Sequence, residues 1–272
     1  MSMPETWRLI PHLCTHGAMQ MAIDRYFLTR HALGTHPPVL RFYSWSPVAL
    51  SLGYHQRSYP ATWHGLTWQG QPIDLVRRPT GGRAVLHQGD LTYAVVASGF
   101  ATNRMESYQQ ICEFLIQGLA TIGIELHYGS AGRGYIHNPN CFGTATAADL
   151  VMADGSKLIG SAQARKGKAI LQHGSIRLTP DRTLFATVFG ETDLFLPQLS
   201  PQQQNIHQLM DALMQAASDC FGVTFTIQPL TPDEFQEIQE MIDCLEDVNP
   251  IPWTSSDRST LQPESIDEFD SR

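Results

Sequence analysis

The chain has 272 residues, of which 42% are hydrophobic and 16% are charged, and its formal net charge is −8. This length allows one large domain or two small ones with a buried core, and no apolar run approaches the roughly 18–20 residues of a membrane span. The five cysteines are widely spaced and odd in number, which argues against a disulfide framework and against a zinc site. Because residues 1–7 also lack the pattern of a secretory signal, we expect a cytoplasmic protein without bound metal.

Helical and strand patterns alternate along the chain. A capping box, Thr231 with Glu234, is expected to open the last helix, and Asn103 with Glu106 an earlier one. In chain order, we predict strands at 7–13, 39–45, 48–53, 73–76, 84–86, 91–97, 124–128, 148–152, 157–165, 169–178 and 223–230, and helices at 17–33, from 103, from 200 to 221 and 231–247. Segment 58–70 is irregular, and we assign it no chemistry.

Charge is distributed unevenly along these elements. The acidic residues are concentrated after residue 230, whereas Lys157 to Arg177 contains five basic residues and no acidic one. That basic strip suits an acidic partner or is simply a solvated hairpin face, and it is too short to indicate nucleic-acid binding. From Val248 onward, acidic residues, Pro, Ser and Thr predominate, so we predict a catalytic domain at 1–247 and a disordered tail at 248–272.

The stretch from Arg77 to His87 combines a tight turn with several hydrogen-bond donors. Gly81 and Gly82 have no side chains, so a ligand could lie directly on their backbone N–H groups. An ordinary β-turn with exposed arginines is the plainer interpretation of a bare Gly-Gly pair. Elsewhere, Asp24 is most simply a solvated or capping carboxylate, and Cys112 falls on the buried stripe of its helix.

Two motifs resemble the biotin/lipoate protein ligase and lipoyl(octanoyl)transferase superfamily. The first is Arg-Arg-Pro-Thr-Gly-Gly-Arg-x-Val-Leu-His followed by Leu-Thr-Tyr, and the second is Lys-x-x-Gly-Ser-Ala-Gln-x-Arg followed by Gln-His-Gly-Ser-Ile. The resemblance covers roughly residues 5 to 235 and implies an α+β fold, with one domain whose large mixed or antiparallel β-sheet is flanked by helices. It also implies an acidic residue near the site in the first helix, at Asp24. The substrate-binding residues that it implies are Arg77, Arg78, Thr80, Gly81, Gly82, Arg83, His87, Tyr93, Gly160, Ser161, Ala162, Gln163, His173 and Gly174.

Cys141 is the residue that separates the branches of this superfamily. A single cysteine is usually inert filler, but Cys141 follows Asn-Pro-Asn in a turn and precedes Phe142. One octanoyltransferase branch has such a Cys-Phe pair just upstream of the lysine motif, and by analogy Cys141 accepts the acyl group while Lys157 lowers its pKa. The chain departs from that branch at residues 143–146, which read Gly-Thr-Ala-Thr where the branch usually has Asp-Ala-Pro-Ser. The gap to the lysine is also one residue longer, so the groups that support the thiolate differ or the substrate is altered.

The resemblance thus implies transfer of an octanoyl group from octanoyl-acyl carrier protein to the lysine of a lipoyl domain, in the glycine cleavage H protein or a 2-oxo acid dehydrogenase E2, without a cofactor. Leu75, Val85, Tyr93 and Ile159 could line an apolar slot for the acyl chain. His87 and His173 either orient the thioester and move protons or are structural. Two alternatives remain open: an ATP-dependent lipoate ligase in which Cys141 is incidental, and a non-catalytic binder of acyl or lipoyl carrier proteins.

Overall fold

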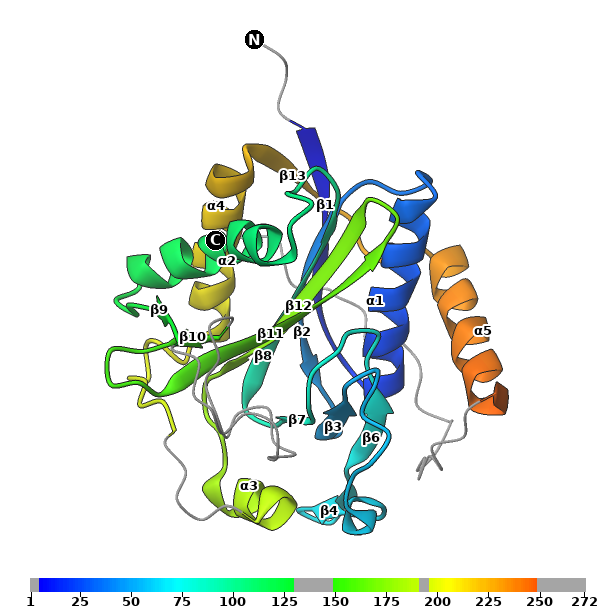
Figure 1. The fold of residues 1–272 in the computed structure, drawn as a ribbon, viewed down its shortest axis with the longest axis vertical. Coiled ribbons are helices and arrows are strands. Elements are labelled where there is room, and N and C mark those ends of the chain that lie inside the picture. The colour runs from blue at the N-terminus through cyan, green and yellow to red at the C-terminus, as the bar shows by residue number, and fades with distance from the viewer. Residues whose placement is uncertain (1–4, 130–148, 191–195, 249–272) are drawn as a thin grey trace, which may run out of the picture.

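An eight-stranded mixed sheet forms the centre of the fold in the computed structural model, which describes residues 5–129, 149–190 and 196–248 (Figure 1). Strands β13, β1 and β2 are parallel, and each later neighbour in the order β13-β1-β2-β8-β12-β11-β10-β9 is antiparallel. Their bounds are β1 Glu5–Thr15, β2 Val39–Trp45, β8 Asp90–Ala97, β9 His127–Tyr128, β10 Leu150–Val151, β11 Lys157–Lys166, β12 Ala169–Arg177 and β13 Val223–Ile227.

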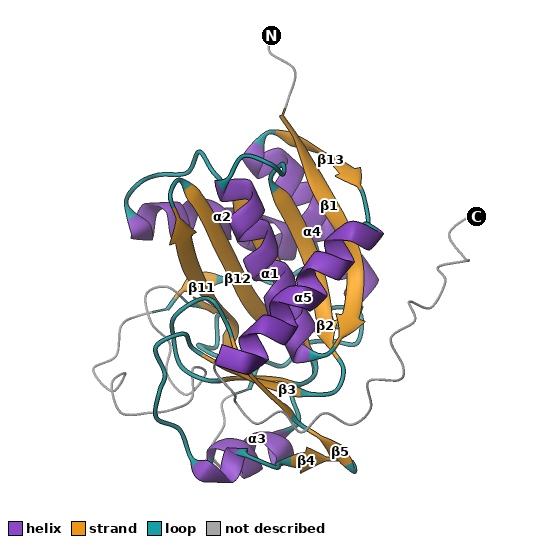
Figure 2. Ribbon diagram, turned by 90° about the vertical axis from the view of Figure 1, so that its right-hand side faces the viewer, coloured by secondary structure: helices purple, strands orange, loops and turns teal. Residues whose placement is uncertain are grey.

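Helices cover both faces of this sheet. Helices α1 (Gly17–Ala32) and α5 (Pro232–Val248) lie on one face, and α2 (Arg104–Thr121) and α4 (Ile206–Phe221) lie on the other (Figures 1 and 2). Every residue of β8 is buried, because its alternate side chains enter the two cores in turn. This explains why the β8 sequence is almost continuously apolar.

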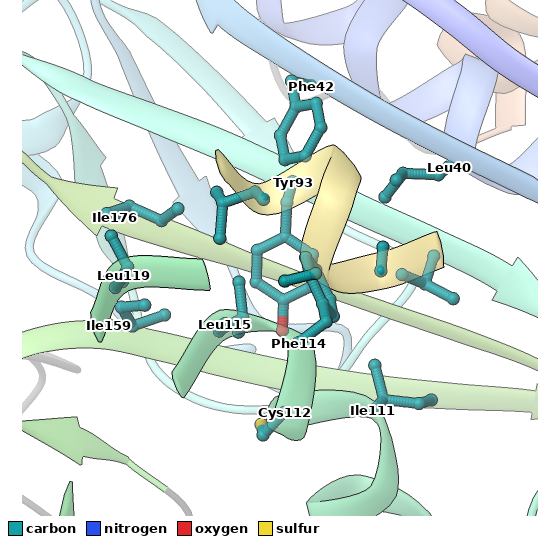
Figure 3. Close-up of a cluster of buried hydrophobic side chains, with 14 of the residues drawn as sticks. Leu40, Phe42, Tyr93, Ile111, Cys112, Phe114, Leu115, Leu119, Ile159 and Ile176 are labelled. Atoms are coloured by element: carbon teal, nitrogen blue, oxygen red, sulfur yellow. The ribbon is translucent and has the colours of Figure 1, made fainter. Parts of the chain in front are cut away.

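Tyr93 of β8 is the link between the core and the site. Its ring packs edge-on against Phe114 of α2, with ring centroids 5.5 Å apart, and lies among Leu115, Ile159 and Ile176 (Figure 3). Burying an aromatic ring of this size contributes on the order of 2 kcal/mol to stability. The Tyr93 hydroxyl donates to Ser161 Oγ at 2.8 Å, so the core fixes the position of β11 as well.

A smaller layer completes the fold below the main sheet in Figure 1. Its three-stranded sheet has the order β6 (Asp74–Arg77), β3 (Ala49–Leu52) and β7 (Val85–His87), and it packs against α3 (Arg182–Phe189). A 3-10 turn at Ala61–Trp63 and a short hairpin, β4 (Thr67–Trp68) with β5 (Gln71–Pro72), fill the segment between β3 and β6. The residues between β6 and β7 form the diglycine loop, which the small sheet holds against the large one.

The predicted α+β class is confirmed, and so are several local signals. Asn103 accepts hydrogen bonds from two N–H groups of the first turn of α2, and Thr231 and Glu234 exchange hydrogen bonds of 2.8 and 3.2 Å at the start of α5. No described helix is long and apolar enough to cross a membrane.

Other boundaries were wrong. The helix expected from residue 200 begins at Ile206, because the Asn205 side chain caps it, and α3 was not predicted. Only residues 127–128 of the strand expected at 124–128 pair, and the strand expected at 223–230 ends at Ile227. The tail predicted from residue 248 lies outside the described residues beyond the end of α5.

Candidate active site

A cavity of about 660 Å³ lies between the large sheet, the small sheet and the start of α2. Both motifs contribute to its wall, although they are far apart in the sequence. The predicted site residues that line it are Arg78, Gly81, Gly82, His87, Lys157, Gly160, Ser161, Ala162, Gln163, His173 and Gly174. Cys141 lies outside the described residues.

Four predicted site residues do not line this cavity. Thr80 and Tyr93 are completely buried, with Tyr93 beneath Ser161. Arg77 donates to the carbonyl oxygens of Gly53 at 2.9 Å and Gln56 at 2.8 Å, and the Arg83 carbonyl accepts a hydrogen bond from Arg78. Thr80 and Tyr93 therefore support the cavity from buried positions, whereas Arg77 and Arg83 are partly exposed.

Arg78 holds the diglycine loop from inside the protein. Its guanidinium donates to the carbonyl oxygens of Ser51 at 2.8 Å, Gly81 at 2.8 Å and Arg83 at 2.7 Å. The side chain is only 5% exposed, so the interpretation as an ordinary turn with exposed arginines is wrong at this position. A buried guanidinium that satisfies three carbonyl groups of its own chain rigidifies the loop.

Two glycines allow the loop to approach its support. Gly82 has a φ of 95°, a region that other residues rarely adopt, and a Cβ on it would lie 2.7 Å from Arg78 Nη2. A Cβ on Gly53, at the end of β3, would lie 1.8 Å from the Gly82 carbonyl oxygen. Sequence reasoning missed Gly53, because no turn motif marks it; only the close packing of two backbone segments requires glycine there.

Lys157 lies at the cavity wall in a buried ion pair. Its Nζ is 2.8 Å from Asp149 Oδ1, and the side chains of the two residues are 4% and 7% exposed. Asp149 was not identified from the sequence, where it resembled any residue at the start of a hairpin. Each of these two buried groups thus has a partner of opposite charge, which offsets the cost of removing them from water.

His87 is held by partners at both ring nitrogens. Nδ1 lies 2.9 Å from Asp90 Oδ2, Nε2 lies 2.9 Å from Ser51 Oγ, and the ring stacks on Trp45 with centroids 3.9 Å apart. Burial lowers the pKa of His87, and the Asp90 carboxylate opposes that shift only in part. A neutral His87 can donate from Nδ1 to Asp90 and accept at Nε2 from Ser51, which favours a structural role.

His173 is held in the same way by Asp24 and Thr80. Its Nδ1 is 2.6 Å from Asp24 Oδ2, and its Nε2 is 2.6 Å from Thr80 Oγ1. Asp24 also lies 3.1 Å from Arg41 Nε and accepts a hydrogen bond from the Tyr43 hydroxyl. Asp24 is thus not a solvated carboxylate: it is 1% exposed and anchors His173, and through Thr80 the diglycine loop. Of the two interpretations of Asp24, a solvated carboxylate or an acidic residue near the site, the second is correct.

The apolar part of the cavity differs from the expected slot. Of the four residues expected to line it, only Val85 does so. Leu75 belongs to the core of the small layer, and Ile159 and Tyr93 belong to the core between the large sheet and α2. Apolar surface comes instead from Met21, Tyr43, Trp45, Met105 and Tyr108. Within the described part of the chain, no three His, Cys, Asp or Glu side chains lie close enough to hold a metal ion.

The chain matches the model of the lipoyl protein ligase A/B catalytic domain over residues 16–237. It belongs to this family. An octanoyltransferase LipM from Kyrpidia tusciae is 34% identical over 264 residues, which span 88% of this chain and 95% of that protein. An octanoyltransferase LipM from Carboxydothermus hydrogenoformans is 40% identical over 182 residues, or 65% of this chain and 66% of that protein.

Solved structures of the lipoyl protein ligase family share the fold. A lipoate-protein ligase A bound with ATP superposes with a TM-score of 0.67 at 23% identity, covering 89% of this chain and 95% of its own. A bipartite lipoate protein ligase from Thermoplasma acidophilum gives a TM-score of 0.65 at 22% identity, with 88% and 92% covered. At these identities the structural likeness establishes the architecture alone. The family resemblance expected from the two motifs is confirmed by the match to the family model and by the LipM relatives.

Proposed function

We propose that this chain is an octanoyltransferase of protein lipoylation, which moves an octanoyl group from octanoyl-acyl carrier protein to the lysine of a lipoyl domain. The observation that carries the proposal is the 34% identity to an octanoyltransferase LipM over nearly the full length of both chains. The convergence of both motifs on one cavity supports it. Because the donor is a cytoplasmic carrier protein, the proposal also places the enzyme in the cytoplasm.

In the first proposed step, the Cys141 thiolate attacks the carbonyl carbon of the octanoyl thioester. A new carbon–sulfur bond forms at Cys141, the bond to the carrier sulfur breaks, and the carrier leaves as a thiolate that takes a proton. The octanoyl thioester is already activated, so no nucleotide is consumed. A free cysteine with a pKa of about 8.5 is only slightly ionised at neutral pH, and a neighbouring cation would increase the reactive fraction.

Lys157 is the proposed source of that positive charge. Its ion pair with Asp149 holds the ammonium at the cavity wall. The carboxylate weakens the field of the ammonium on a nearby thiol, but it leaves N–H donors that can stabilise the thiolate or the oxyanion of the tetrahedral intermediate. Backbone N–H groups near Gly81-Gly82 or Gly160 are candidates for the same role, and all three glycines line the cavity.

In the second proposed step, the neutral amine of a lipoyl-domain lysine attacks the octanoyl-Cys141 thioester. An amide bond forms, the amine loses a proton to solvent, and Cys141 is released as a thiolate. The acceptor would be the glycine cleavage H protein or a 2-oxo acid dehydrogenase E2. Neither proposed step requires a cofactor.

The decisive experiment mixes the protein with octanoyl-acyl carrier protein and a lipoyl domain without ATP, and follows the masses of all three proteins. We expect an octanoyl adduct on the enzyme and then on the lipoyl domain, and no adduct on a Cys141→Ala variant. Cys112 is buried and its pKa is raised to about 12 by burial, so Cys112→Ala is the matched control and should retain transfer. Modification of the lipoyl domain only in a parallel reaction with ATP would instead establish a ligase, and no modification under either condition would leave a carrier-protein binder.

A further inference from the structure

Four basic side chains form a surface beside one end of the cavity, which we call the rim patch: Arg104, Arg165, Lys166 and Lys168. All four are exposed. Arg104 starts α2 and itself lines the cavity, next to Met105, which is 45% exposed. The other three lie at the tip of the β11–β12 hairpin, beside α1 (Figure 1).

The rim patch is smaller than the basic strip predicted from the sequence. Lys157 and Arg177, at the two ends of that strip, are both buried, and the Arg177 guanidinium lies over the Phe185 ring. Of the predicted strip, only the residues at the hairpin tip can therefore present their charge to a partner. Arg104 of α2 adds a fourth positive charge beside them.

Three of the four rim-patch side chains make hydrogen bonds that do not neutralise their charge. Arg165 donates to Ser107 Oγ at 2.6 Å, Arg104 to the Gln163 carbonyl at 3.2 Å, and Lys166 to Thr29 Oγ1 at 3.1 Å. All of these acceptors are uncharged.

Four basic side chains elsewhere meet carboxylates, while others, such as Arg77 and Arg78, bind backbone carbonyl oxygens. The pairs are Arg8 with Glu234, Arg30 with Glu237, Arg41 with Asp24 and Lys157 with Asp149, whereas none of the four rim-patch residues has a carboxylate within ion-pair distance among the described residues. A cluster of exposed, uncompensated cations is a surface that attracts an acidic partner.

The cavity extends from Lys157 to the rim patch along β11. Its wall includes Lys157 and the consecutive residues 160–164, and Arg165 follows directly. At about 3.3 Å per residue, Lys157 and Arg165 are about 26 Å apart along the strand. The four-carbon stem of a substrate lysine cannot span that distance from a domain docked at the hairpin tip, whereas an extended pantetheine arm is several times longer than the lysine stem and covers most of it.

We propose that the rim patch is the docking surface for the acyl donor, an acidic carrier protein whose thioester arm lies along β11 with its reactive carbonyl near Lys157. This inference rests on the proposed function and assigns a separate surface to the donor. The lipoyl domain, whose lysine is short, must approach the Lys157 end of the cavity more closely and does not use the hairpin tip.

The test is a titration with holo-acyl carrier protein, which has the arm but no octanoyl group, so that binding is measured without transfer. We expect the Lys166→Gln/Lys168→Gln variant to bind about tenfold more weakly than wild type at low ionic strength. The difference should shrink at high salt, because screening weakens both proteins' attraction for the carrier. Affinity for the lipoyl domain should not change.

A Gln202→Glu/Gln208→Glu variant is the matched control. It changes the net charge by the same amount, at exposed positions before and within α4, and should bind the carrier as wild type does. Equal carrier affinity of wild type and the lysine variant would overturn the inference, as would equal weakening in the control or a loss confined to the lipoyl domain. If wild type binds the carrier through the patch but transfers no octanoyl group, the docking surface stands and the proposed function fails.

Discussion

Replacing Gly53 with alanine tests whether the diglycine loop depends on direct contact between two backbone segments. The added Cβ would lie 1.8 Å from the Gly82 carbonyl oxygen, 2.7 Å from the Gly82 carbonyl carbon and 3.2 Å from the Gly81 carbonyl carbon. An ordinary contact with a Cβ begins at about 3.4 Å, so one segment must move by about 1.5 Å. The loop cannot yield freely, because Arg78 and the Tyr54 N–H hold its carbonyl groups.

Overpacking of this kind costs about 1–3 kcal/mol, and each kcal/mol lowers the Tm of a protein of this size by about 2–4 °C. We therefore expect Gly53→Ala to lower Tm by several degrees in a thermal unfolding measurement. A displacement of about 1 Å at a positioned site can reduce the rate about a hundredfold, so kcat/KM for octanoyl transfer should fall by more than the stability loss explains.

Gly81→Ala adds the same methyl group to the same loop and is the matched control. No atom lies within 4 Å of a Cβ at Gly81, and its φ is not in the left-handed region. Its Tm should stay within about a degree of wild type. If Gly53→Ala unfolds at the wild-type temperature and transfers at the wild-type rate, the close approach does not position the loop.

Three buried carboxylates give further expected outcomes. Asp24→Asn leaves the buried Arg41 guanidinium uncompensated and should lower the free energy of unfolding in urea by about 3–5 kcal/mol. Lys157→Gln should destabilise the protein by about 3 kcal/mol, because the Asp149 carboxylate loses its ammonium partner; Lys157→Gln/Asp149→Asn should regain most of that stability yet remain inactive. Burial raises the pKa of Glu234, but hydrogen bonds from the Arg8 guanidinium and the Thr231 N–H outweigh it and lower the pKa to about 2. A lowered folded-state pKa stabilises the protein above the unfolded value of about 4.3 and loses that effect as pH falls toward 2, so Tm measured against pH should drop less steeply in this window for Glu234→Gln.

Exposed carboxylates provide the controls for these variants. Asp211→Asn on α4 and Glu240→Gln on α5 remove a carboxylate from the surface and should change stability by less than about 0.5 kcal/mol. A urea midpoint for Asp24→Asn equal to that of Asp211→Asn would contradict the anchoring role of Asp24. If Lys157→Gln/Asp149→Asn is no more stable than Lys157→Gln alone, the ion-pair account is contradicted. If Tm falls with pH as steeply in Glu234→Gln as in wild type, the account of Glu234 is contradicted.

Local patterns in the sequence were sufficient for most of the fold. The alternating apolar residues of 39–45 gave β2 with its observed bounds, and the Thr231–Glu234 capping box marked the start of α5. These signals are local, because periodicity and capping depend on residues within one or two turns of each other. The start of α4 was missed because Ser200-Pro201 and Asn205 are both good start signals. In the structure Asn205 caps the helix, and residues 201–204 form turns before it.

The two motifs, read as a family resemblance, were also sufficient to find the residues of one cavity. Their individual tasks were not visible in the motifs. Arg77 and Arg78 look like donors for a ligand, but in the folded chain their guanidinium groups bind carbonyl oxygens of neighbouring backbone. A motif identifies the residues of a site, but it does not show which of their atoms face the ligand.

The sequence by itself determined the fold class, the family and the set of segments that form the site. Only the tertiary structure decided the roles of Asp24, Gly53 and Asp149, because each depends on a partner that strand order brings close. Asp24 and His173 are 149 residues apart in the chain, and their 2.6 Å contact exists because α1 packs on the face of the sheet that His173 also faces. A buried carboxylate and a solvated one are identical in sequence, and the difference between them is the loss of water, which only packing brings about.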